Sequence, residues 1–150
     1  MNVSLLKVIT MLSCFIGVVC GLVALLPYLN GLAFFVLICL SSIIIVLTLM
    51  KLNVLKLESI PESLAIGGII GFLSYIAFSI VYIPFAVLLI RVFKYSSNYG
   101  VSLMLGHSNL FVILMISVFL AAFCATVNGI TSLCIYYINK FIENLNNQQQ

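Results

Sequence analysis

The sequence predicts an all-α integral membrane protein, a four-helix bundle with both termini on the inner side of the membrane. Three observations support this: an apolar composition, four long uncharged runs, and small residues that recur at every fourth position. Hydrophobic residues make up 65% of the 150 residues and charged residues 6%, against roughly 45–50% and 25% in soluble domains. So few charged side chains cannot cover a water-facing surface, so we expect the surface to face lipid.

Four apolar runs contain no Asp, Glu, Lys, Arg or His. They are Val8–Leu29, Leu32–Met50, Ser63–Ile90 and Leu110–Ile138. Each is close to or above the roughly 20 residues that a helix needs to cross a bilayer, and none alternates in polarity as a barrel strand does. We therefore expect one four-span domain over residues 1–143, followed by a polar, disordered tail over 144–150.

The first run is expected to remain in the mature protein. Lys7 provides a short positive flank, but the 22 apolar residues of Val8–Leu29 exceed the roughly 7–15 residues of a signal-peptide core. No small-residue cleavage site follows this run. We therefore expect a transmembrane helix here.

Basic residues near the ends of the runs predict the orientation, because cytoplasmic loops carry an excess of Lys and Arg. With the N-terminus inside, the outer loops hold Arg91 and Lys94, and the inner segments hold Lys7, Lys51, Lys56 and Lys140. This asymmetry predicts an N-in, C-in topology with the 91–109 loop outside. The apolar stretch Tyr99–Gly106 within that loop is expected to rest on the bundle or the interface, or alternatively to re-enter the membrane.

Small residues recur at every fourth position in three of the four runs. These candidate helix-packing residues are Ser13, Gly17 and Gly21 in the first run, Ser63, Gly67 and Gly71 in the third, and Ser117, Ala121, Ala125 and Gly129 in the fourth. Lipid tails are as apolar as Leu, so close backbone contact and interhelical hydrogen bonds must hold such helices together. We expect the first, third and fourth helices to pack closely and the bulkier second helix to lie at the periphery.

One amide side chain lies deep in the fourth run. Asn128 is about as far from the inner face as Ser74 and Tyr75 of the third run. A buried amide without partners is costly in hydrocarbon, so we expect Asn128 to form an interhelical hydrogen bond, first of all with Ser74 or Tyr75. Alternatively, the same three residues line a polar pocket for an uncharged solute.

The residue types of catalysis and metal binding are sparse. The chain has no Asp, its three Glu flank the runs, and its one histidine, His107, lies in the outer loop. The cysteines all fall inside apolar runs without a C-x-x-C pair and are expected to be free thiols: Cys14, Cys20, Cys39, Cys124 and Cys134. We predict no catalytic, metal or cofactor site, no enzyme activity and no nucleic-acid partner.

Two stretches carry a resemblance, "GVVCGLVALLPYLN" in the first helix and turn and "SLAIGGIIGFLSYIAFSIVYIP" in the third helix. Together they resemble a loose group of uncharacterised small bacterial four-span membrane proteins with Gly-rich first and third helices. The resemblance covers about Gly17 to Pro84. It implies a bacterial inner-membrane location and no particular activity.

These observations favour a non-enzymatic, multi-pass membrane protein that acts as an accessory or self-associating component. Its partners are then the lipid bilayer and either a second copy or another membrane protein. The alternative is a channel or facilitator for a small uncharged solute, with Asn128, Ser74 and Tyr75 near its path. A holin-like pore former is a third interpretation.

Overall fold

The computed structural model describes residues 3–26, 28–95 and 99–148, and these residues form helices and short connections. The elements are α1 (Val3–Val23), α2 (Asn30–Phe35), the π-helical turn η1 (Val36–Leu40), α3 (Ser41–Lys51), α4 (Ile60–Phe93), α5 (Tyr99–His107) and α6 (Leu110–Gln148). Because α2, η1 and α3 are continuous, they form one spanning helix. The expected four long apolar helices are confirmed: four are long and apolar enough to cross a membrane.

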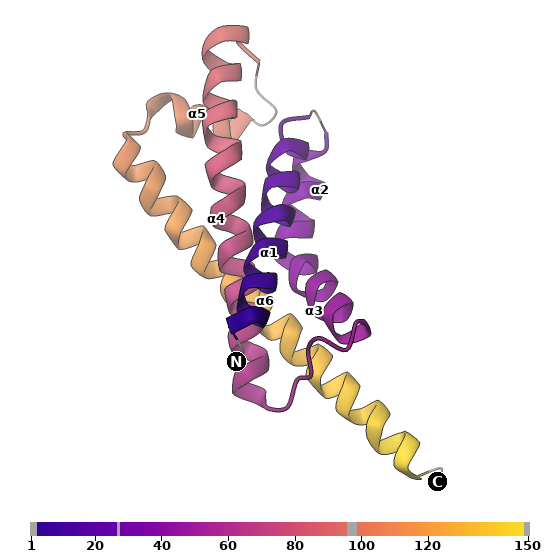
Figure 1. The fold of residues 1–150 in the computed structure, drawn as a ribbon. Helices are drawn as coiled ribbons and strands as arrows, with labels where there is room; N and C mark the ends of the chain where they lie inside the picture. The colour runs from indigo at the N-terminus through magenta and orange to yellow at the C-terminus, as the bar shows by residue number, and fades with distance from the viewer. Residues whose placement is uncertain (1–2, 27, 96–98, 149–150) are drawn as a thin grey trace.

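The four long helices form one bundle in which both ends of the described chain lie at the same end (Figure 1). We call this the terminal end, and it also holds the loop of residues 52–59 between α3 and α4. The opposite, distal end holds the connection between α1 and α2 and the short helix α5. In Figure 1, α6 crosses α4 obliquely rather than running alongside it.

Several boundaries differ from those expected. Helix α4 has 34 residues rather than spanning 63–90 only, with a proline in its first turn, where the missing N–H costs no hydrogen bond. Helix α6 has 39 residues and stays helical through Gln148, so the disordered tail expected from residue 144 is not observed up to that residue. The physical reason is local: no Gly or Pro follows Gly129, and Asn139 Nδ2 donates to Glu143 Oε1 at 3.1 Å, one turn further on.

The turn between the first two spans comes earlier than expected. Helix α1 ends at Val23, although the first apolar run continues to Leu29, and Asn30, which lies between the first two runs, begins α2. The buried Asn30 side chain donates from Nδ2 to the Ala24 carbonyl at 3.2 Å and to the Tyr82 hydroxyl at 3.1 Å. This amide therefore ties the end of α1 and the start of α2 to α4.

Helix α4 lies at the centre of the packing and contacts α1 and α6 at backbone distance. On the α1 side, a Cβ placed on Gly17 would collide with the Ser74 carbonyl oxygen and lie 2.8 Å from the Ala77 Cβ. On the α6 side, a Cβ on Gly67 would collide with the Asn128 carbonyl oxygen, and one on Gly71 with that of Cys124. These glycines permit the close approach that holds apolar helices together in lipid.

The remaining small residues of the three ladders do not all pack alike. Ser63 reaches α6, where its Oγ lies 3.2 Å from Ser132 Oγ. Ala121 is fully buried, whereas Ala125 is only half-buried. Ser117 uses its hydroxyl within its own helix, donating to the Ile113 carbonyl at 2.8 Å.

The second span is not peripheral, contrary to expectation. We compared the most apolar stretch of each spanning helix. In the second span 39% of this stretch is buried inside the protein, compared with 28% in α1, 28% in α4 and 17% in α6. Bulky side chains of this span, such as Leu37, Ile45 and Val46, fill the space between α1, α4 and α6. Because the second span has no ladder of small residues, it was expected to lie away from the other helices. Packing of large side chains, however, buries a helix as effectively as close backbone contact does.

The apolar stretch in the 91–109 loop is the helix α5, which lies beside the distal part of α4 (Figure 1). Leu105 packs against the buried cluster that includes Phe78 and Tyr82. His107 is exposed, and its Nδ1 lies 3.1 Å from the Leu103 carbonyl of the same helix. The segment therefore packs against the bundle through Leu105.

Two adjacent glycines allow a matched test of this packing. We expect Gly67→Ala to lower the free energy of unfolding by about 1–3 kcal/mol, because the added methyl collides with α6 backbone. At Gly68 the nearest atom to an added Cβ is 3.8 Å away, so Gly68→Ala should be neutral or stabilising by up to about 1 kcal/mol through helix propensity. Thermal or denaturant unfolding in mild detergent measures both, and equal effects would show that α4 and α6 do not meet at Gly67.

Candidate functional site

A layer of buried polar side chains crosses the middle of the bundle. It consists of Ser13 on α1, Ser41 and Ser42 on α3, Ser74 on α4 and Asn128 on α6, and all five have 0% exposure. Within each spanning helix, these residues lie between two apolar clusters. We call this set the polar layer.

The two clusters define the layer's position. The cluster toward the terminal end includes Ile9, Ile45, Ile66 and Ile135. The cluster toward the distal end includes Cys20, Leu37, Phe78 and Ala121, and in it the rings of Phe78 and Tyr82 stack with centroids 5.0 Å apart. Polar groups between two apolar clusters have no water to bond to, so their partners must come from the protein or from a bound molecule.

Asn128 uses all of its hydrogen-bonding capacity within the protein. Its Oδ1 accepts from Ser41 Oγ at 2.8 Å and from the Ser42 N–H at 2.9 Å. Its Nδ2 donates to the carbonyls of Ile38 at 3.0 Å and Cys124 at 2.9 Å, with Leu37 slightly further away at 3.3 Å. An amide offers two donors and two acceptor lone pairs, so Asn128 is satisfied.

The bonds to Ser42 and Ile38 have a special relation to the helix ladder. In a regular α-helix the N–H of residue 42 bonds the carbonyl of residue 38. Here the Asn128 carboxamide bonds both groups, accepting from the Ser42 N–H and donating to the Ile38 carbonyl. A side chain of α6 thus bonds both of these backbone groups of the second span, next to the π-helical turn Val36–Leu40.

A π-turn in an apolar interior leaves backbone carbonyls that need other donors. Asn128 Nδ2 is such a donor, to the Ile38 carbonyl at 3.0 Å and the Leu37 carbonyl at 3.3 Å. Ser41 Oγ also lies 2.9 Å from the Leu37 carbonyl, and its single hydrogen serves either that carbonyl or Asn128 Oδ1 at one time. The turn and the amide therefore depend on each other: the turn exposes the carbonyls, and the amide makes them tolerable in an apolar interior.

Three hydroxyls of the polar layer have a different status. The Oγ atoms of Ser13, Ser42 and Ser74 are buried without a hydrogen-bond partner. A buried hydroxyl that lacks a partner costs about 1–3 kcal/mol relative to one that is bonded. These atoms are thus the groups in the layer whose hydrogen-bonding capacity is unused.

The packing register places these hydroxyls near Asn128 in depth. Gly17 opposes the Ser74 carbonyl, and Gly71 opposes Cys124 and the Asn128 Cβ. Ser13 lies one helical turn from Gly17, and Ser74 lies one turn from Gly71. All therefore lie within about one to two turns of the same level, each turn being about 5.4 Å.

The expected partners of Asn128 were wrong. Neither Ser74 nor Tyr75 bonds it, and all its partners outside α6 belong to the second span. Matching depths along antiparallel helices predicted which part of α4 lies at the level of Asn128. It did not predict which face of α4 is turned toward Asn128 at that level. That face is Gly67 and Gly71, which offer no side chain to bond.

The other two members of the expected pocket lie close by. Ser74 lies in the layer, with its carbonyl against Gly17, whereas Tyr75 is 5% exposed and packs its ring against Phe78, with centroids 5.7 Å apart. Sequence reasoning missed Ser41 and Ser42. The available signal was their position, since they are the only adjacent serines within an apolar run.

The cysteines and acidic residues form no further site in the described chain. All five thiols are free, Cys20 and Cys124 being buried and Cys134 exposed. Across residues 3–26, 28–95 and 99–148, no group of three or more His, Cys, Asp or Glu is arranged to hold a metal ion.

Fold and layer together define a class: an all-helical bundle with four spanning-length helices, compatible with a multi-pass membrane protein. Comparison with known proteins does not narrow this class, because no protein family, curated protein or solved structure matches the chain significantly.

The amide network can be tested by its removal. We expect Asn128→Leu to lower the free energy of unfolding by about 1–3 kcal/mol, since it leaves the Ser41 hydroxyl and the backbone of the π-turn without their partner. Ser117→Ala, which removes a hydroxyl bonded only within its own helix, should cost less than about 0.5 kcal/mol.

A double-mutant cycle isolates the contact between α6 and the second span. Ser41→Ala should cost less in the Asn128→Leu background than in the wild type, because the Oγ–Oδ1 bond is already lost. Unfolding in mild detergent measures each variant. Strictly additive effects would contradict the network.

Proposed function

We propose that the chain is a non-enzymatic, multi-pass membrane protein that works by association, as a self-associating or accessory component. The observation that carries this is the exposed apolar surface of α6. In the most apolar stretch of this helix only 17% of the residues are buried, the lowest share among the four spans. Phe111 and Phe119 in its distal half are 66% and 72% exposed. Large aromatic side chains are the residues that most often anchor protein interfaces.

The use of interior polar groups supports the same proposal. Asn128, the most polar side chain of the layer, has its bonding capacity taken up by the second span and by its own helix. Ser63 and Ser132 bond each other. These groups join helices, which is the role that polar residues have in packed membrane bundles.

The proposal is tested by the mass of the purified protein. We expect light scattering in mild detergent to give a defined oligomer or a defined complex with another membrane protein. Phe119→Ala should shift this species toward the monomer by about tenfold in dissociation constant, the change that about 1.4 kcal/mol produces. Met11→Ala is the matched control, since Met11 is 77% exposed on α1. A monomer at every concentration, without a partner, would contradict the proposal.

The second candidate is a facilitator for a small uncharged solute. The specific observation in its favour is the three buried, unpartnered hydroxyls of Ser13, Ser42 and Ser74, which resemble the interior polar residues that mark solute pathways. Flux of water and glycerol into proteoliposomes separates the two candidates. Flux above that of protein-free liposomes, reduced by Ser74→Ala, favours the pathway, whereas no added flux favours association.

We further propose an N-in, C-in orientation in a bacterial inner membrane, supported by the lysine distribution and by the location that the sequence resemblance implies. Alkaline phosphatase, which is active only outside the cytoplasm, should be active when fused after Ser97 and inactive when fused at Asn144. The opposite pattern would reverse the orientation while leaving the fold unchanged.

A further inference from the structure

The second span consists of two helical halves joined by the π-helical turn η1. The distal half, α2, buries residues three or four apart, and this series continues into the turn: Asn30, Ala33 and Leu37. The terminal half, α3, buries a second series, in which the spacing is four: Ser41, Ser42, Ile45, Val46 and Leu49. Each series is the bundle-facing stripe of its own half.

The two stripes do not belong to one face of a regular α-helix. At about 100° per residue, their centres would point about 120° apart along an uninterrupted α-helix. If the count between Leu37 and Ser41 were one residue shorter, the centres would lie only about 20° apart. A π-turn closes its hydrogen bond one residue later than an α-turn, so it takes up one extra residue. The turn Val36–Leu40 therefore corrects the phase and lets both halves face the bundle.

The Asn128 side chain bonds the second span at this turn. Its Oδ1 accepts from the Ser42 N–H at 2.9 Å, and its Nδ2 donates to the Ile38 carbonyl at 3.0 Å. In a regular α-helix these two backbone groups bond each other. In an apolar interior both groups need a partner. If the amide is withdrawn, they satisfy each other by pairing, and this pairing converts the π-turn into an α-turn.

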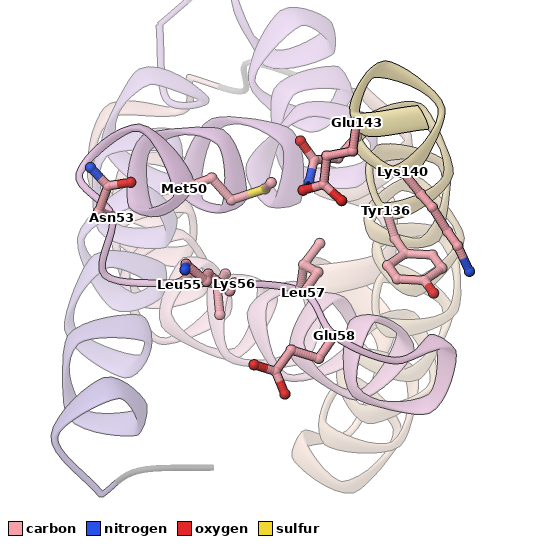
Figure 2. Close-up of a pocket in the computed structure, with 10 residues that line it drawn as sticks. Met50, Asn53, Leu55, Lys56, Leu57, Glu58, Tyr136, Lys140 and Glu143 are labelled. Atoms are coloured by element: carbon pink, nitrogen blue, oxygen red, sulfur yellow. Dashed lines mark hydrogen bonds between the residues drawn. The ribbon is translucent and has the colours of Figure 1, made fainter. Parts of the chain in front are cut away.

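The terminal half is anchored at its far end by the 52–59 loop. The N–H groups of Val54 and Leu55 both donate to the Leu49 carbonyl, at 3.0 and 3.2 Å. The loop then runs back below α3 from Asn53 past Leu55 to Leu57 (Figure 2), and Leu55 and Leu57 are buried. Because α3 is fixed in this way, a change of phase at the π-turn is taken up by the distal half.

Turning the distal half changes which of its side chains face the bundle. Leu37 has 0% exposure, whereas Phe35 is 58% exposed. A rotation of about 100°, the angle of one residue, carries Leu37 out of the bundle and Phe35 toward it. The rotation also withdraws Asn30, whose Nδ2 donates to the Ala24 carbonyl and to the Tyr82 hydroxyl. The polar layer and the distal end are therefore coupled through one helix.

We propose that the π-turn and Asn128 form a conformational device with two settings. In the observed setting, Asn128 bonds the turn and the distal half faces the bundle. In the second setting, Asn128 is released, the Ser42 N–H bonds the Ile38 carbonyl, and the distal half is turned by about 100°. A side chain of α6 thereby controls the junction that Asn30 makes at the distal end. The device belongs to a single chain and does not depend on the self-association proposed above.

Thiol labelling tests the rotation. The five native cysteines are replaced by alanine, and Leu37→Cys or Phe35→Cys is added and labelled with N-ethylmaleimide in mild detergent. With Asn128 present, the thiol at position 37 should react at least about fivefold more slowly than the thiol at position 35, because a buried thiol reacts only when the chain opens locally. Asn128→Leu should reverse this order. Faster labelling of both thiols, or an unchanged order, would overturn the proposal.

Deletion of one residue is a second test, with an effect of opposite sign. Deleting Cys39 removes one residue between the two buried stripes, so that a regular α-helix faces the bundle along its whole length. In the Asn128→Leu background this deletion should restore at least about half of the lost Tm, because no backbone group then needs the amide. In the wild type the same deletion should lower the Tm by about 3 °C or more, because Asn128 loses its partners on the second span.

Deletion of Leu47 is the matched control. Leu47 is 50% exposed and lies in the regular part of α3, so its removal turns Leu49 out of phase with the rest of that helix. This deletion should lower the Tm in both backgrounds. Equal effects of the two deletions in the Asn128→Leu background would show that the π-turn is not a one-residue phase shift. Circular dichroism of each variant reports whether its helices are intact.

Discussion

The approach of α4 to its two neighbours at backbone distance is the constraint on which the rest of the bundle depends. Inside a bilayer no hydrophobic effect draws apolar helices together, so contact must come from tight packing and hydrogen bonds. Gly17 brings α1 against the Ser74 carbonyl, and Gly67 and Gly71 bring α4 against the carbonyls of α6. Two different faces of one helix are used, and α4 is central for that reason.

This close contact also explains how the second span is held. Because α4 presents glycine backbone to Asn128, the amide finds no side chain on α4 and turns to the second span instead. There it bonds the Ser42 N–H and the Ile38 carbonyl beside a π-helical turn. Such a turn is costly in hydrocarbon unless a neighbouring helix supplies the missing partners. The glycine ladder, the amide and the π-turn are three parts of one solution.

The polar groups of the chain fall into two zones with different chemistry. The polar layer contains uncharged side chains, some bonded between helices and three with free hydroxyls. The terminal end contains the charged side chains of the 52–59 loop and of the helix ends beside it: Lys51, Lys56, Glu58, Glu62, Lys140 and Glu143. Since charge is costly at the centre of a bilayer and inexpensive at its edge, this division is what a spanning bundle requires.

The sequence by itself determined which four segments form long apolar helices, because uncharged apolar length depends only on local composition. It also identified Gly17, Gly67 and Gly71 as packing residues, since only small residues allow such an approach. The helix ends were less predictable. The turn before α2 depends on the bonds of the Asn30 amide to Ala24 and to Tyr82, which is 52 residues away. The extension of α6 is supported by a side-chain bond between Asn139 and Glu143, one turn apart.

The tertiary structure alone decided which faces meet. A period of 3.6 residues fixes the faces of each helix relative to one another, but the rotation of one helix against the next depends on all its neighbours at once. For this reason Asn128 was placed at the right level and given the wrong partner. The second span was expected at the periphery, although side chains such as Leu37, Ile45 and Val46 are buried against the other helices. Ser41 and Ser42 acquire their roles only when α3 and α6, more than 80 residues apart in the sequence, come together.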